Sequence, residues 1–388
     1  MKKIFIYLLL LVFLSGCWDV NESERMLYLH GIGVDYKDGE FHVYFQVISF
    51  MNVAKKDEGI DQELMQAEVG FAKGKTINEA ITNLYKATDE ILFWGHLTVI
   101  IITDDMITNG NLNTLLNSFT RHNDTRYNTW VYVTDKPLKD FFIETPILRK
   151  AISLTKMANP INSFEKQSFI EPVNVRKLLI KLNEPNHVVT LPYIEIKDDV
   201  WTTEKGPDPA ISMDSVAVLT PTEFRGFIKG KNAKGFQWMT KETKKSYITT
   251  NIGEDDQDAE DYITMTITNH SVKVNPVIKG DDVRFDIDIS VSANLDSFNK
   301  KISQEQIDEA VVKTIKEDIK RTFKKGLELE CDVFRLSEQL YRKNVKLWKK
   351  LEKEGSLPLN EDSIRNINIY VDKVDTGRKK YSRSVVSP

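Results

Sequence analysis

The first sixteen residues constrain this chain most, because they have the three regions of an export signal. Two lysines form a basic head, the apolar run 4–14 follows, and two small residues end at Gly16, directly before Cys17. A helix rises about 1.5 Å per residue and about 20 residues are needed to cross a bilayer core, so this run is too short to span a membrane. We therefore predict a cleaved signal peptide over residues 1–16.

Cys17 stands at the expected cleavage position, in the order Leu-Ser-Gly-Cys. This order looks like the bacterial lipobox, in which the signal is cut between Gly16 and Cys17 and the cysteine carries an S-diacylglycerol group and an N-acyl chain. Two or more acyl chains hold a protein on a membrane stably, whereas one chain binds reversibly. We predict a body anchored by Cys17 to the outer face of a membrane. The alternative is an ordinary signal peptide that happens to end in a cysteine.

The remaining chain has the composition of a folded body, with 41% hydrophobic and 28% charged residues overall. Its length predicts two to three domains of about 150 residues each. The formal charge of −4 becomes −6 once the two signal lysines are removed, and this mild acidity argues against a nucleic-acid partner. Only Cys331 remains after lipidation, so no intrachain disulfide is expected. We interpret Cys331 as a small buried residue rather than a reactive thiol.

Strands and helices alternate in the first half of the chain. Asp38-Gly39 predicts a hairpin turn before a strand at 41–50. Thr76 and Glu79 form a capping box, which predicts a helix over 77–90. A strand at 97–103, a helix from about 112 to 119 and a strand at 130–134 follow. This alternation predicts a sheet with helices packed against it.

The second half contains the strongest chain breaker, GPDPAIS at 206–212, which we interpret as a domain boundary. β-rich segments follow, and the acidic run 253–261 reads as a solvated loop. Ser303 caps a long helix that ends near Gly326, a second helix is predicted over 333–353, and a strand ends near 377.

The overall prediction is an α+β fold of three domains with mixed, largely antiparallel sheets flanked by helices. After the signal peptide these are an N-terminal α+β domain at 17–205, a middle β-rich domain at 206–280 and a C-terminal α+β domain with two long helices at 281–388.

Motifs for catalysis or metal binding are missing from the sequence. The six histidines are at least twelve residues apart, so they form no local metal pair. We find no Gly-x-Ser-x-Gly elbow and no phosphate-binding glycine loop, and the pair Gly31 and Gly33 reads as hairpin spacing. We therefore expect no enzyme activity, no cofactor and no metal, although a triad assembled from distant residues stays open.

Several motifs together resemble the Ger(x)C family, the C-subunit lipoproteins of spore germinant receptors in endospore-forming bacteria. They occur in family order along the whole chain: the lipobox with Trp18-Asp19, GIGVD at 31–35, LFWGHLTVIII at 92–102, Arg121, CDVF at 331–334, and Trp348. Two positions depart from the family pattern. Arg335-Leu336-Ser337 replaces a glycine-containing turn after CDVF, and Asp214-Ser215 replaces an aspartate-glycine pair.

The resemblance implies a non-enzymatic subunit in the spore inner membrane. It would work beside a multi-spanning A subunit and a transporter-like B subunit, all three being needed for small nutrients such as amino acids or sugars to trigger germination. It also implies three α+β domains.

Trp94, His96 and Arg121 are candidate contacts to a partner protein. The alternative for the first two is a buried turn with a hydrogen-bonded histidine. Arg121 and Arg126 flank a loop and are either surface ion-pairing residues or contacts to another subunit.

Two other functions remain. A solute-binding lipoprotein of an importer predicts two doubly wound lobes with a hinge, which the hairpin at the start and the β-rich order argue against. An envelope hydrolase is disfavoured by the missing motifs.

Overall fold

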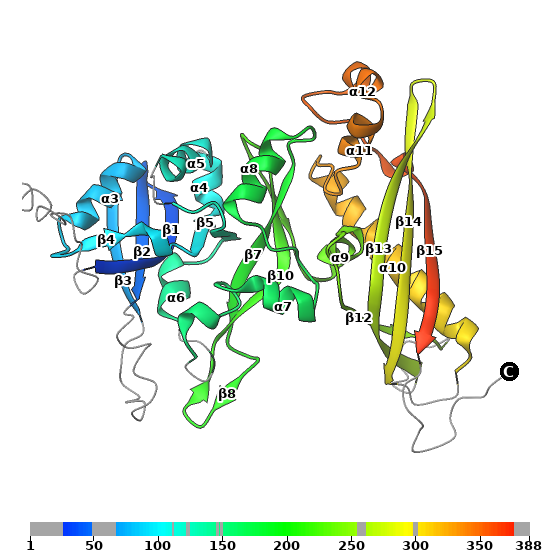
Figure 1. Cartoon of the computed structure of the whole chain (residues 1–388), viewed down its shortest axis with the longest axis horizontal. Coiled ribbons are helices and arrows are strands. Elements are labelled where there is room, and N and C mark those ends of the chain that lie inside the picture. Colours follow the sequence, from blue (N-terminus) through cyan, green and yellow to red (C-terminus); the bar gives the residue numbers. More distant parts are fainter. Residues whose placement is uncertain are drawn as a thin grey trace, which may run out of the picture.

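The protein is described by a computed structural model that covers residues 26–48, 67–110, 112–121, 125–144, 147, 150–253, 261–297 and 302–375. Figure 1 shows two β-sheets side by side, each with helices packed on it. The first sheet has nine strands and the second has four, and a two-stranded sheet joins β8 (Thr202–Thr203) to β9 (Gly206–Pro207).

The first sheet opens with the predicted hairpin. Strands β1 (Met26–Lys37) and β2 (Glu40–Ile48) are antiparallel, and Asp38 and Gly39 between them have φ of 54° and 75°. Two successive positive φ values are typical of the tight turns that match strand twist. Strand β3 (Ala67–Gly74) pairs with β2 at the sheet edge. It was not predicted, because its glycines and exposed positions weaken the strand pattern.

The centre of this sheet is parallel. Strand β1 pairs in parallel with β4 (Ile91–Phe93) and β5 (Val99–Thr103), and β5 pairs in parallel with β6 (Trp130–Thr134). Helices α4 (Asp104–Asn109) and α5 (Leu112–Thr120) carry the chain from β5 to β6, as a parallel connection requires. The prediction of a mixed sheet is confirmed: among the described strands of this sheet, four pairings are antiparallel and four are parallel.

Three more strands, each antiparallel to the next, complete the first sheet. β7 (Val189–Lys197) pairs in parallel with β6. Its other edge pairs with β10 (Ala210–Leu219), and β10 pairs with β11 (Phe224–Ile228). Helices cover both faces. The apolar sides of α3 (Ile77–Tyr85), α4, α5 and α8 (Val175–Asn183) fill one core, and α6 (Leu138–Ile143) packs on the opposite face. Helix α3 has the predicted Thr76 cap but ends at Tyr85, five residues before the predicted end.

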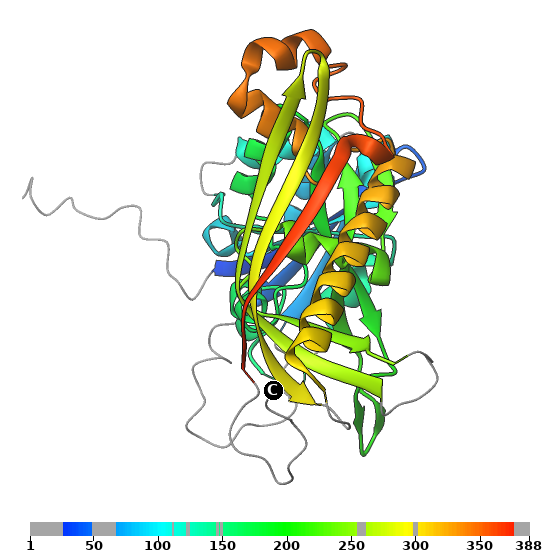
Figure 2. The ribbon, with the colours of Figure 1, turned by 90° about the vertical axis from the view of Figure 1, so that its right-hand side faces the viewer.

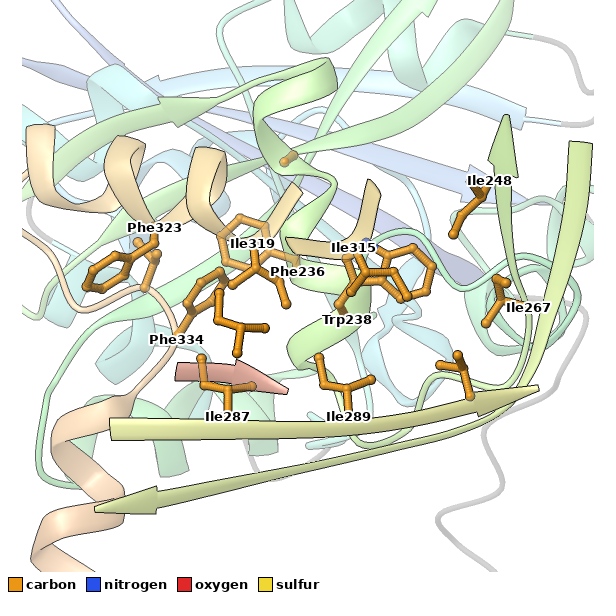
Figure 3. Packing of buried hydrophobic residues seen from close by; sticks show 14 of the residues in the cluster. Phe236, Trp238, Ile248, Ile267, Ile287, Ile289, Ile315, Ile319, Phe323 and Phe334 are labelled. Atoms are coloured by element: carbon orange, nitrogen blue, oxygen red, sulfur yellow. The ribbon is translucent and has the colours of Figure 1, made fainter. Parts of the chain in front are cut away.

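The second sheet runs β12 (Ser246–Asn251), β13 (Tyr262–Lys279), β14 (Asp282–Ser297), β15 (Ile364–Asp375). Only the last pair is parallel. Helix α10 (Gln304–Glu328) begins with the predicted capping box at Ser303 and lies along this sheet (Figure 2). In Figure 3, Ile315 and Ile319 of α10 face Ile287 and Ile289 of β14. Each isoleucine that is fully buried in this way contributes about 1.5–3 kcal/mol.

The second predicted long helix is two short ones. Helix α11 (Leu336–Lys343) ends before Asn344, which has φ of −151°, and α12 (Val345–Leu351) starts directly after it. The Asn344 side chain accepts a hydrogen bond from the main-chain N–H of Leu347 at 3.1 Å. An asparagine that caps in this way favours a new helix start over continuation. The prediction of two long C-terminal helices is therefore wrong for the second helix.

Neither predicted domain boundary coincides with a change of sheet. The boundary at 205/206 lies between β7 and β10, which pair in one sheet, and the boundary at 280/281 lies in the turn between β13 and β14. The chain passes from the first sheet to the second between β11 and β12, through the short helices η5 (Gly230–Ala233) and α9 (Gly235–Met239). The three-domain division stays a prediction.

The remaining short helices are η2 (Trp94–His96), η4 (Ile152–Leu154), α7 (Pro160–Lys166) and η7 (Glu361–Ser363).

Candidate functional site

The predicted anchor lies outside the described residues. Cys17 and Gly16 precede Met26, where the first strand begins. Among the helices that the structure describes, none is both long enough and apolar enough to cross a bilayer.

We call the nine-stranded sheet with its helices the first unit, and the four-stranded sheet with its helices the second unit. Trp94 lies in the core of the first unit. It starts η2, the turn between β4 and β5, and its side chain is 5% exposed. Its Nε1 donates a hydrogen bond to the hydroxyl of Tyr85 at 2.9 Å, and its ring packs edge-on against Phe45 at 5.6 Å. A Cβ added at the neighbouring Gly95 would lie 2.7 Å from the Phe93 ring, so a larger residue at this position would have to displace that ring. The geometry matches the buried-turn interpretation for Trp94.

His96, two residues later, is exposed. Its ring packs edge-on against Tyr28 at 5.3 Å and lies 5.5 Å from the Phe93 ring. Partial burial lowers the pKa of His96, and the positive charge of Arg126 lowers that pKa further. His96 is therefore a surface residue that packs on the rings of Tyr28 and Phe93.

Arg121 is exposed at the end of α5. Its side chain makes no hydrogen bond or ion pair with any residue that the structure describes. Arg126 acts on His96, whereas no interaction joins Arg121 to His96 in the described ranges. The three candidate contacts are thus one buried tryptophan and two surface side chains, and their partner role stays a prediction.

The described residues hold no group of three or more His, Cys, Asp or Glu side chains placed to bind a metal ion. Cys331 is buried and has a free thiol, as expected from the sequence. Burial raises the pKa of this thiol to about 11, so it is protonated at neutral pH and is a poor nucleophile.

Sequence reasoning missed a polar cluster that joins the two sheet units. We call it the junction cluster: Asn186, Asp332, Arg335, Gly355 and Ser356. It links the segment between α8 and β7 to the segments before α11 and after α12.

Asn186 occupies the centre of the junction cluster and is 2% exposed. Its main-chain N–H donates to the carbonyl of Gly355 at 2.8 Å, and its Nδ2 donates to the carbonyl of Asp332 at 3.0 Å. Its Oδ1 accepts from the Ser356 hydroxyl at 2.8 Å. The side-chain amide of Asn186 thus donates to the segment before α11 and accepts from the segment after α12.

Arg335 completes the cluster from the other side. Its backbone is left-handed, with φ of 56° and ψ of 39°, and it begins the segment Arg335-Leu336-Ser337, which departs from the glycine-containing turn of the family pattern. Nη1 donates to the carbonyl of Val188 at 2.8 Å and Nη2 contacts Glu184 Oε2 at 3.2 Å. Nε donates to Glu338 at 2.6 Å. The departure from a glycine-containing turn was the sequence signal for this site. Two of the partners, Val188 and Glu184, are more than 140 residues away in the sequence, and only folding brings them to Arg335.

Asp332 is the buried carboxylate of the cluster. It accepts hydrogen bonds from the main-chain N–H groups of Leu336 at 2.9 Å and Ser337 at 2.7 Å, at the start of α11. Burial raises the pKa of Asp332 to about 6, although the two N–H donors and Arg335 act in the opposite direction. The cluster therefore contains a group whose charge depends on pH in the mildly acidic range.

Known proteins match nearly the whole chain. The family described as "Spore germination protein N-terminal domain" matches residues 19–196, and "Spore germination B3/ GerAC like, C-terminal" matches residues 214–373. The "Prokaryotic membrane lipoprotein lipid attachment site" matches residues 1–17.

Two relatives have low sequence identity but match over most of their length. Spore germination protein KC of Bacillus subtilis (strain 168) is 21% identical over 364 residues, which cover 89% of this chain and 88% of that protein. Spore germination protein B3 of the same organism is 20% identical over 366 residues, which cover 90% of this chain and 91% of that protein.

A solved structure has a similar fold. The crystal structure of the GerBC protein aligns with a TM-score of 0.56 over 89% of this chain and 96% of that chain, at 14% identity. The resemblance drawn from the motifs is confirmed: the chain belongs to the GerAC/GerBC family of spore germination proteins and carries a lipoprotein attachment site, which anchors it to a membrane.

Proposed function

We propose that this protein is the lipid-anchored C subunit of a spore germinant receptor and that the response of spores to small nutrients requires it. One observation carries the proposal: a lipid attachment site ending at Cys17 is followed directly by the two halves of the germination family. The protein would lie on the outer face of the spore inner membrane, held by the acyl chains on Cys17.

The subunit acts through contacts with the integral-membrane A and B subunits rather than through chemistry of its own. His96 and Arg121 support this role, because both are exposed charged or titratable side chains in the first unit. Neither belongs to a cluster resembling a catalytic site within the described ranges.

Replacement of the anchor cysteine tests the proposal. Cys17→Ala should abolish acylation and strongly reduce the germination rate of spores, because stable attachment needs the acyl chains. Intact mass of the membrane-extracted protein reports acylation, and loss of optical density after addition of nutrient reports germination. Cys331→Ala is the matched control: it removes a thiol but no anchor, and we expect a much smaller effect.

Two results would contradict the proposal. An unmodified Cys17 in the wild-type protein removes the anchor. A normal nutrient response in spores that lack the protein, together with intact levels of the other receptor subunits, removes the receptor role. Calorimetry that detects micromolar binding of an amino acid or sugar to the protein alone would instead favour the solute-binding alternative.

A further inference from the structure

The second sheet ends in an unpaired strand edge. β15 has twelve residues and pairs only with β14, so its other edge meets no strand in the described part of the chain. Figure 2 shows β15 as the last strand of the sheet, on the side nearest α10. A strand edge presents a row of main-chain N–H and C=O groups that another extended chain can pair with.

A groove runs between this edge and the flank of α10. It has a volume of about 600 Å³ and is lined by one side of α10 and by residues 361–368. Phe323, Leu327 and Ile364 give it an apolar floor, and all three belong to or pack against the core of the second unit. The groove therefore offers both unmet main-chain groups and apolar surface.

Three lysines line the helical wall of the groove: Lys316, Lys320 and Lys324. None of them makes a hydrogen bond or ion pair with a residue that the structure describes. Arg365 on the opposite wall is already paired with Asp286 of β14 through two hydrogen bonds. Glu361 and Asp362 are the acidic groups of the lining, both in η7, just before β15 begins. The wall formed by α10 thus carries three positive charges that form no ion pair with the described residues.

The lysine spacing matches that of an extended chain. Lysines four residues apart on a helix are separated by about 6 Å along its axis. Every second residue of a strand points to the same side, and these residues are separated by about 6.6 Å. A strand with an acidic residue at every second position would therefore place successive carboxylates opposite successive lysines.

We propose that this groove binds an extended acidic segment of a partner protein, which adds to the free edge of β15 as a fifth strand and pairs its carboxylates with Lys316, Lys320 and Lys324. Main-chain hydrogen bonds to β15 supply the affinity, and the lysines select charge and register. The site goes beyond the receptor role, because it specifies the chemistry of the bound segment and not the protein that supplies it. A membrane surface could meet the lysines, but it could not pair with the strand edge.

A synthetic peptide tests the site. We would label a ten-residue peptide that alternates glutamate with threonine and titrate it with the full-length lipidated protein in detergent micelles, using fluorescence anisotropy. A peptide of the same composition with its glutamates in one block controls for charge alone. We expect the alternating peptide to bind at least about tenfold more tightly than the blocked one.

Variants then locate the binding site. Replacing all three groove lysines by alanine should weaken binding of the alternating peptide by about tenfold or more. The control replaces Lys346, Lys349 and Lys353, three exposed lysines in and just after α12, and should change affinity less than about twofold. Equal losses in both triple variants, or equal binding of both peptides, would overturn the proposal in favour of non-specific charge attraction.

Hydrogen exchange distinguishes strand addition from simple ion pairing. Main-chain amides within 364–375 should exchange more slowly when the alternating peptide is bound, because an edge amide gains a hydrogen-bond partner. No added protection in β15 would overturn the proposal.

Two further experiments test whether a membrane surface or a second copy of this chain occupies the groove instead. If phosphatidylserine vesicles compete fully with the peptide, the lysines bind a membrane surface instead. If the wild type self-associates in sedimentation and the groove variant does not, the occupant is a second copy of this chain. Either result replaces the partner segment and overturns the proposal.

Discussion

Arg335 donates a hydrogen bond from Nη1 to the main-chain carbonyl of Val188 at 2.8 Å, across 147 residues of chain. The same side chain reaches Glu184 and Glu338, and it extends from a left-handed backbone position. A largely buried charged side chain that contacts a main-chain carbonyl and two carboxylates fixes the relative position of the segments that carry them. Arg335 therefore holds the second unit against the end of α8.

Substitution of Arg335 should destabilise the protein strongly. We expect Arg335→Ala to lower the free energy of unfolding by about 3 kcal/mol, the lower end of the range for a broken buried pair, because Glu338 keeps its contact with Arg342. Arg335→Gly should be more stable than Arg335→Ala by about 1 kcal/mol, since glycine adopts positive φ without steric cost. Urea unfolding followed by tryptophan fluorescence measures both.

The control for Arg335 is Arg342→Ala. Arg342 contacts the same two glutamates, but its side chain is 62% exposed. Exposed ion pairs contribute about 0–1 kcal/mol, so the control should remain close to the wild type. Equal destabilisation by Arg335→Ala and Arg342→Ala would contradict the assignment of the junction to Arg335.

Asp332 should make stability depend on pH. Its carboxyl pKa in the folded protein is about 6, above the value of about 3.9 expected in the unfolded chain. The folded state therefore binds the proton more tightly. The resulting stabilisation is fully present below about pH 4 and is lost as the pH rises through about 6.

The comparison that isolates this group is wild type against Asp332→Asn. The difference in their unfolding free energies should change by up to about 1.4 kcal/mol per pH unit between about pH 4 and 6 and should be constant above that range. Urea unfolding at several pH values measures it. A difference that does not vary with pH would mean that the carboxyl does not titrate there, and that its two N–H donors keep it ionised.

Gly33 is a second testable position. Gly31 and Gly33 lie inside β1, the first strand of the predicted hairpin, under the ring of Phe142 from α6. A Cβ at Gly33 would lie 2.7 Å from Phe142 Cε2 and 3.1 Å from Leu138 Cδ1. Gly33→Ala should therefore cost about 1–3 kcal/mol through overpacking.

A double-mutant cycle with Phe142→Leu tests the cause. The smaller side chain makes room for the added methyl group, so the double variant should be more stable than the sum of the single effects predicts. Strict additivity would show that α6 is not the obstacle. Thermal or urea unfolding provides all four free energies.

The candidate contacts should separate into structural and functional residues. Trp94→Ala should destabilise the protein by about 3–5 kcal/mol, because it empties a core position and removes the hydrogen bond to Tyr85. His96→Ala and Arg121→Ala should leave stability within about 0.5 kcal/mol, because both side chains are on the surface.

Spore germination then tests the partner role of the surface pair. If His96 or Arg121 contacts another subunit, its alanine variant should slow germination while the protein level in the spore membrane, measured by immunoblot, is unchanged. Normal germination in both single variants and in the double variant would remove these residues from the partner surface.

Local sequence patterns determined much of the secondary structure. The Asp38-Gly39 turn, the caps at Thr76 and Ser303 and the strand at 130–134 all lie where they were predicted. Each depends on residues within a few positions of each other: a backbone that tolerates positive φ, a hydroxyl that accepts from a helix N–H, or a run of β-branched side chains. The membrane anchor belongs to this class too, because a short apolar run and one cysteine define it.

Only the tertiary structure decided which strands pair and which distant residues come into contact. The parallel centre of the first sheet depends on which strands meet after α4 and α5, and the need for glycine at position 33 depends on Phe142 arriving from more than 100 residues away. Arg335 was visible as part of a segment that departs from a glycine-containing turn, but its structural role comes from carbonyl and carboxylate partners about 150 residues earlier. A sequence window contains the donor and not its acceptor, because long-range hydrogen bonds and packing exist only once the chain has brought distant segments together.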